Sequence, residues 1–147
     1  MAASESDAAE MTAPAALVAW HRVVDTRDPA LLGDLLAEDA VFHSPVVHKP
    51  QVGRDLVTMY LNGALHVLGN DSFTYVREIV GPNDAMLEFL ATVDDVQVNG
   101  VDIIHWDDQQ RITDFTVMLR PIKAIQLVRE RMAALLAHVP TPQPDAE

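Results

Sequence analysis

One acidic residue stands on an otherwise apolar strand face and is the first candidate for chemistry. Residues 96–106 alternate with the period of a strand. One side of that strand carries Val98, Gly100, Asp102, Ile104 and Trp106. If this side faces a pocket, loss of water raises the pKa of Asp102 and favours the neutral acid, which can donate a hydrogen bond to a carbonyl or enolate oxygen. The alternative is a structural aspartate held by a backbone amide or by Trp20.

Trp20 is the second candidate, because its indole ring offers one N–H donor and no acceptor. It shares the spacing i, i+3, i+7 with Leu17 and Val24, which predicts a first helix near residues 13 to 25 with this stripe towards the core. Either the indole N–H serves a ligand oxygen, or Trp20 is a core residue. The sequence leaves both interpretations open.

The composition narrows the chemistry and the partners. The chain has no cysteine, which excludes disulfides, thiolate metal sites and a cysteine nucleophile. Its formal charge of -12 disfavours nucleic acid and anionic lipid as partners. There is no apolar run long enough to cross a membrane and no pattern typical of a secretory signal. We therefore expect a soluble, cytoplasmic protein whose chemistry depends on Asp, Glu, His, Ser or Tyr side chains or on a bound cofactor.

The order of predicted elements indicates an α+β domain over residues 13–139, between disordered segments at 1–12 and 140–147. The predicted helices are 13–25, a short one capped by Asp28 and running through Leu36, one between Gly53 and Gly69, and a last one opened by Pro121; the predicted strands are 40–44, 73–80, 85–93, 96–106 and 111–119. The last four strands form an antiparallel meander. Helices on one face of a bent sheet leave a concave space, which we expect to be a mainly apolar pocket.

Two apolar surfaces in this outline need a cover. The last helix carries Ile125, Val128, Met132, Leu135 and Leu136 on one face. That face can bury itself on the open end of the pocket, on the back of the sheet or on a second subunit. The outer face of the sheet carries Leu90, Val101 and Ile103, which predicts a homodimer.

The chain also resembles the ketosteroid isomerases within the nuclear transport factor 2-like superfamily, which includes SnoaL-type polyketide cyclases and limonene epoxide hydrolases. The residues that carry the resemblance are 20–25, 36–45, 53–55, 59–60, 101–107 and 111–113. The resemblance implies a cone-shaped, curved antiparallel sheet wrapped around the N-terminal helices, the cystatin-like roll, with an extra C-terminal helix. It also implies an apolar small molecule as the ligand.

The resemblance assigns roles position by position. Ketosteroid isomerases have an aspartate base where this chain has Ser44, a tyrosine donor where it has Trp20, and a protonated aspartate donor where Asp102 is retained. Ser44 cannot abstract a proton unaided, so His43 and His48 are the nearest replacement bases. Strand alternation points His43 away from the pocket unless a bulge re-aims it.

The expected catalytic set is therefore Asp102, Trp20 and His43, and no metal site is expected. The ligand-binding residues predicted beside them are Ser44, Tyr60, Phe42, Ile104, Phe115 and Val117. SnoaL-type cyclases carry an acidic residue at the position of Val117. Two function classes remain open: a cofactor-independent isomerase, cyclase or dehydratase acting on a carbonyl compound such as a steroid or polyketide, and a non-catalytic ligand-binding or dimeric scaffold protein.

Overall fold

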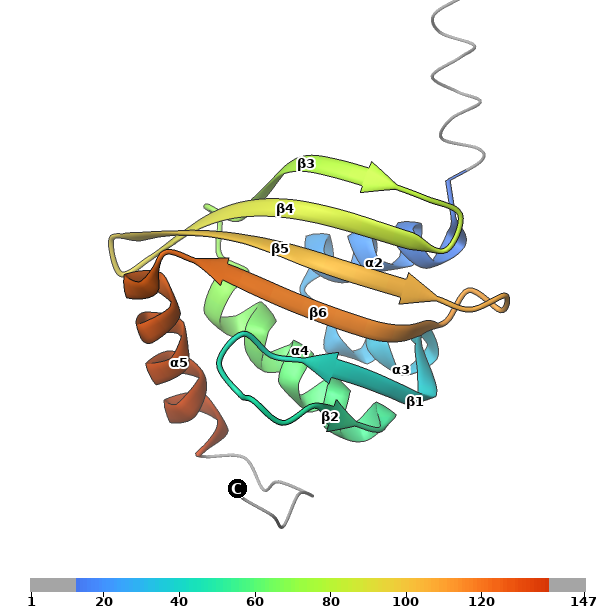
Figure 1. The fold of residues 1–147 in the computed structure, drawn as a ribbon, viewed down its shortest axis with the longest axis horizontal. Helices are drawn as coiled ribbons and strands as arrows, with labels where there is room; N and C mark the ends of the chain where they lie inside the picture. The colour runs from blue at the N-terminus through green and yellow to red at the C-terminus, as the bar shows by residue number, and fades with distance from the viewer. Residues whose placement is uncertain (1–12, 138–147) are drawn as a thin grey trace, which may run out of the picture.

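The computed structural model describes residues 13–137 of the 147. The predicted disordered segments, 1–12 and 140–147, lie outside the described residues. Figure 1 shows one bent sheet with helices behind it and one further helix at its end. In chain order the elements are α2 (Ala15–Thr26), η1 (Pro29–Leu31), α3 (Leu32–Leu35), β1 (Leu36–His43), β2 (Gln51–Val52), α4 (Arg54–Leu68), β3 (Thr74–Val80), β4 (Asp84–Val93), β5 (Val96–Trp106), β6 (Ile112–Arg120) and α5 (Ile122–Leu136).

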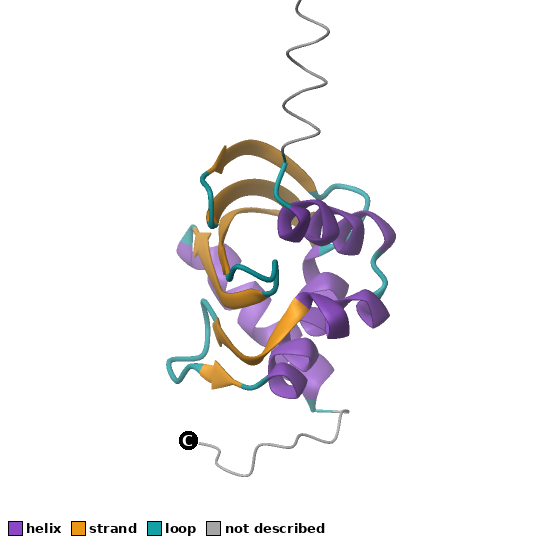
Figure 2. Cartoon of the chain, turned by 90° about the vertical axis from the view of Figure 1, so that its right-hand side faces the viewer, coloured by secondary structure: helices purple, strands orange, loops and turns teal. Residues whose placement is uncertain are grey.

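The six strands form a single sheet in the order β2-β1-β6-β5-β4-β3. The predicted meander of β3 to β6 is confirmed, with every neighbouring pair antiparallel. The sheet is nevertheless mixed rather than wholly antiparallel, because β1 runs parallel to β6. The chain between them, which includes α4 and β3 to β5, is long enough for the crossover that a parallel pair requires. Figure 2 shows the sheet curling around the helices.

The first helices fill the concave side of the sheet. Of the predicted stripe, Leu17 and Trp20 of α2 are buried in the core, and Val24 is half-buried against it. The side chain of Asp28 accepts a hydrogen bond from the amide of Ala30, which confirms the predicted cap. The short helix after it ends at Leu35 rather than at Leu36. Leu36 has extended backbone angles and is the first residue of β1.

The last helix, α5, covers one end of the cone. Its residues Ala124, Val128 and Met132 are buried in one apolar cluster with Leu68 of α4 and Phe89 of β4. The sequence left three positions open for the apolar face of this helix: the open end of the pocket, the back of the sheet or a second subunit. In the structure α5 lies at the end of the cone, beside α4 (Figure 1). None of the helices in residues 13–137 combines the length and hydropathy that a transmembrane span needs.

Candidate functional site

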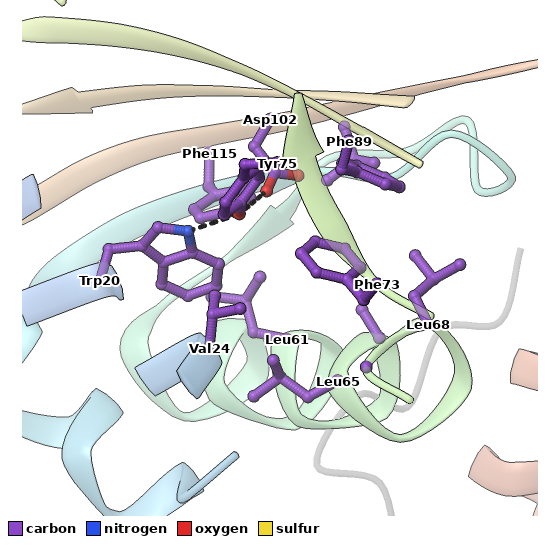
Figure 3. A pocket seen from close by; sticks show the side chains of 13 residues that line it. Trp20, Val24, Leu61, Leu65, Leu68, Phe73, Tyr75, Phe89, Asp102 and Phe115 are labelled. Atoms are coloured by element: carbon purple, nitrogen blue, oxygen red, sulfur yellow. Dashed lines mark hydrogen bonds between the residues drawn. The ribbon is translucent and has the colours of Figure 1, made fainter. Parts of the chain in front are cut away.

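Three side chains from three elements form a hydrogen-bonded row inside the cone. The indole Nε1–H of Trp20 on α2 donates to the hydroxyl oxygen of Tyr75 on β3, at 2.9 Å. That hydroxyl donates in turn to Oδ2 of Asp102 on β5, at 2.5 Å (Figure 3). Within the described part of the chain, the carboxyl of Asp102 therefore bonds neither a backbone amide nor Trp20, and the hydroxyl of Tyr75 lies between the two predicted donors.

A bulge in β3 sets the position of Tyr75. The register of β3 on β4 shifts between Tyr75, opposite Phe89, and Arg77, opposite Glu88. The extra residue, Val76, lets Tyr75 and Glu78 both face the helices although they are three positions apart. Glu78 lies 3.1 Å from Nε2 of His21, whose ring meets the ring of Tyr75 edge-on at 5.6 Å between centroids.

Burial controls the protonation of Asp102. The residue is 6% exposed, and desolvation raises the pKa of its carboxyl from 3.8 to about 7, against a smaller lowering by the hydrogen bond from Tyr75. No cationic side chain in residues 13–137 contributes to this pKa. Burial and the adjacent carboxyl also raise the pKa of Tyr75 well above its usual value of 10. Around neutral pH, Asp102 therefore populates both of its protonation states while Tyr75 keeps its proton.

The row forms the polar part of an otherwise apolar cavity between α2, α4 and the sheet. Its volume is about 40 Å³, room for roughly three water-sized groups. In Figure 3 the rings of Trp20 and Phe73 flank the space, with Val24, Leu61 and Leu65 on the side of the helices. Its walls are Trp20, Val24, Leu61, Ala64, Leu65, Leu68, Gly69, Phe73, Tyr75, Phe89, Asp102, Phe115 and Val117.

The structure therefore brings together four of the predicted residues, namely Asp102, Trp20, Phe115 and Val117. His43 does not join them. Its Nε2 lies 3.4 Å from a carboxylate oxygen of Asp114, and both side chains are more than 40% exposed. Strand alternation on β1 accounts for this position, because His43 follows the inward-facing Phe42.

Ser44 and Phe42 line a separate apolar cavity of about 20 Å³, between the loop after β1, α4, β6 and α5. The hydroxyl oxygen of Ser44 accepts hydrogen bonds from the amides of Val46 and Val47, at 3.0 and 3.2 Å, so it organises the turn at Pro45. This cavity shares Ala64, Leu68 and Val117 with the larger one.

The last two predicted ligand-binding residues lie beside the cavities without lining either. Tyr60 stacks on Phe42 at 6.0 Å between ring centroids, and partial burial raises the pKa of its hydroxyl. Ile104 is 1% exposed and belongs to the apolar core. Within residues 13–137, no three histidine or acidic side chains gather in a group that could hold a metal ion.

Sequence reasoning missed Tyr75. The pattern of residues 73–80 predicts the strand that carries Tyr75, but the hydrogen-bond partners of Tyr75 are 55 and 27 residues away along the chain. The available signal was composition, since Tyr75 is one of only two tyrosines and a buried phenol needs a partner.

Comparison with known proteins gives relatives of the same fold. The profile of the SnoaL-like domain matches residues 17–115. A steroid delta-isomerase from Pseudomonas aeruginosa is 42% identical, with a TM-score of 0.80, and the match covers 84% of this chain and 90% of that one. An uncharacterised protein with a cystatin-like fold from Silicibacter pomeroyi is 31% identical at the same TM-score, over 86% and 89% of the two chains. A protein of unknown function from Mesorhizobium loti, described as NTF2-like, is 20% identical over 72% and 88%, with a TM-score of 0.63. No curated protein matches.

Proposed function

Because the chain belongs to the SnoaL-like domain family, we propose that it binds a small apolar molecule in the cavity at Asp102, whose neutral carboxyl donates a hydrogen bond to a carbonyl oxygen of the ligand. The observation that carries this proposal is the buried carboxyl of Asp102 in an apolar wall, with a pKa of about 7. A carboxyl held neutral in such a wall is a strong hydrogen-bond donor to an oxygen. Ketosteroid isomerase itself is the established example of this effect.

The volume limits which part of a ligand is enclosed. A cavity of about 40 Å³ admits a compact group, whereas whole drug-sized ligands occupy several hundred Å³. A steroid or polyketide would therefore place its carbonyl end beside Asp102 and extend from the opening, unless the walls move.

Catalysis is the second candidate, as a cofactor-independent isomerase, cyclase or dehydratase. Two observations favour it: the relative that is 42% identical is a steroid delta-isomerase, and a group with a pKa of about 7 can both accept and donate a proton at neutral pH. Ser44 and His43 lie outside this cavity, so Asp102 would have to move the proton itself. Tyr75 would then be the neighbouring hydrogen-bond donor.

One pair of compact ketones tests both candidates. We expect cyclohexanone to bind wild type and Asp102→Asn with affinities within about threefold, and Asp102→Leu about tenfold more weakly, because leucine removes a hydrogen bond of roughly 1.4 kcal/mol. Quenching of tryptophan fluorescence measures binding. Conversion of 3-cyclohexen-1-one to the conjugated 2-cyclohexen-1-one, followed by ultraviolet absorbance, measures proton transfer from one carbon to another.

If the protein is an isomerase, Asp102→Asn should lower this conversion at least about 100-fold while leaving cyclohexanone affinity almost unchanged. Wild type that binds cyclohexanone without converting the unsaturated ketone would assign a binding function alone. Equal affinity of wild type and Asp102→Leu for cyclohexanone would contradict the proposed hydrogen bond.

We further propose that the outer face of the sheet pairs two copies of the chain. A polar row crosses four strands there: Arg77 lies 3.1 Å from Glu88, Asn99 donates to Glu88 at 3.0 Å, and Arg120 donates to Asn99 at 3.4 Å. Apolar side chains flank this row, and Ile79 and Met118 are 60% and 55% exposed. An isologous dimer would cover them on both copies at once.

The dimer makes a measurable prediction. Light scattering at micromolar concentration should give a mass of twice 16.2 kDa for wild type and the monomer mass for Met118→Glu, which places a charge in the proposed interface. Val18→Glu is the matched control, because Val18 is 49% exposed on α2, which packs on the opposite, concave side of the sheet, so this variant should remain dimeric. A monomeric wild type would contradict the proposal.

A further inference from the structure

The cavity at Asp102 has an unusual wall, because five of the eight aromatic residues of the chain line it. These five are Trp20, Phe73, Tyr75, Phe89 and Phe115. Several of the rings stand at steep angles to one another: Trp20 meets Phe115 at 66° and 4.8 Å, and Phe73 meets Tyr75 at 82° and 5.1 Å. Such angles give the space several ring walls that face in different directions (Figure 3).

The carboxylate of Asp102 is the one negative charge that this wall can carry, and it has no counter-ion within the described residues. Among residues 13–137, Tyr75 is the only titratable side chain that forms a hydrogen bond with Asp102, while Glu78 and His21 lie behind the ring of Tyr75. The strands beside β5 place apolar residues opposite Asp102, namely Leu87 and Val117. The residue that α2 contributes is Trp20, whose indole ring is neutral and donates to Tyr75. Tyr60 of α4 stacks on Phe42.

From this geometry we infer that the cavity also binds alkylammonium groups, with the rings surrounding the cation and the ionised carboxylate of Asp102 neutralising it. The faces of aromatic rings attract cations, and ring-lined sites of this kind recognise quaternary ammonium ligands. A buried carboxylate without a counter-ion is costly, so a ligand that brings the missing positive charge relieves that cost. The volume of about 40 Å³ suits a compact head group.

The charge of the whole chain acts in the same direction. A formal charge of -12 raises the local concentration of cations and lowers that of anions around the protein. This inference goes beyond the carbonyl ligand proposed above and shares with it only the requirement that the cavity admits a ligand. The two ligand classes need opposite protonation states of Asp102: the neutral acid for a carbonyl oxygen and the carboxylate for a cation.

Choline and its uncharged isostere 3,3-dimethyl-1-butanol form a matched pair of probes for calorimetric titration. With an Asp102 pKa of about 7, roughly one tenth of the carboxyl is ionised at pH 6 and nine tenths at pH 8, so choline should bind about tenfold more tightly at pH 8. The affinity of the alcohol should not rise over this interval. Choline that binds no better than the alcohol at pH 8, or equally well at both pH values, would overturn the inference.

Two variants separate the effect of the charge on Asp102 from the effect of the net charge of the chain. Asp102→Asn should weaken choline binding at pH 8 at least tenfold and leave the alcohol unaffected, whereas Asp108→Asn removes one charge from an exposed loop and should leave both probes unaffected. Phe73→Leu keeps the apolar bulk and should weaken choline alone, by threefold or more. Equal losses in Asp102→Asn and Asp108→Asn would contradict a site at Asp102.

Cyclohexanone keeps the two proposals distinct. Binding of the ketone without choline would reject the ammonium site and leave the carbonyl proposal standing. Binding of choline with the stated pH dependence, without binding of the ketone, would support the ammonium site and reject the carbonyl proposal.

Discussion

Asp102→Asn is expected to remove about 4 kcal/mol of pH dependence from the free energy of unfolding between roughly pH 4 and pH 7. The folded protein raises the pKa of Asp102 from 3.8 to about 7, so the native state holds a proton that the unfolded chain releases. The stability linked to this group is therefore fully present below about pH 4 and falls as pH rises through 7. A shift of about three pKa units at roughly 1.4 kcal/mol each gives the magnitude.

The measurement is urea unfolding of wild type and Asp102→Asn at several pH values across this interval. The other acidic residues affect both proteins alike, so the difference between the two free energies isolates Asp102. Asparagine has the size of the neutral acid and keeps an oxygen that can accept from the hydroxyl of Tyr75, so the variant should fold. A difference that stays constant with pH would show that the carboxyl of Asp102 is not held in the neutral form.

The fold was accessible from the sequence because its signals are local. The apolar stripe of Leu17 and Trp20, the cap at Asp28 and the alternation along β5 each lie within one element, and each element appears where its pattern predicts. The parallel pairing of β1 with β6 was not accessible in this way. It joins segments separated by most of the domain, and no period along either strand encodes its direction.

The candidate site was only half accessible for the same reason. Alternation on β5 placed Asp102 on the inner face, and its apolar neighbours predicted the raised pKa. Its partner could not be found from any pattern, because the hydrogen bond from Tyr75 depends on strand order and on the bulge at Val76. A resemblance to a family assigns roles to positions but does not show which residues contact them. It pointed to Ser44 and His43 as site residues, and both lie outside the cavity at Asp102.

Gly100 shapes the site without contributing a side chain to it. It lies on the inner face of β5, opposite Phe89 of β4 and Leu119 of β6. A methyl group at this position would overlap the ring of Phe89 and would lie 2.7 Å from Cδ2 of Leu119 and 2.9 Å from the backbone oxygen of Met118. The missing side chain allows Phe89, a wall of the cavity, to lie across the backbone of β5.

Gly100→Ala should therefore lower the free energy of unfolding by about 3 kcal/mol or more, because the backbone oxygen cannot retreat and the ring of Phe89 is 1% exposed in a packed cluster. Gly33→Ala is the matched control. A methyl group there meets no atom within 4 Å, and alanine is the better helix former in α3, so the change should be neutral or stabilising by up to about 1 kcal/mol. Urea unfolding measures both variants. A loss below about 1 kcal/mol in Gly100→Ala would mean that Phe89 can move aside, and the cavity at Asp102 would then be a deformable space whose walls adapt to larger ligands.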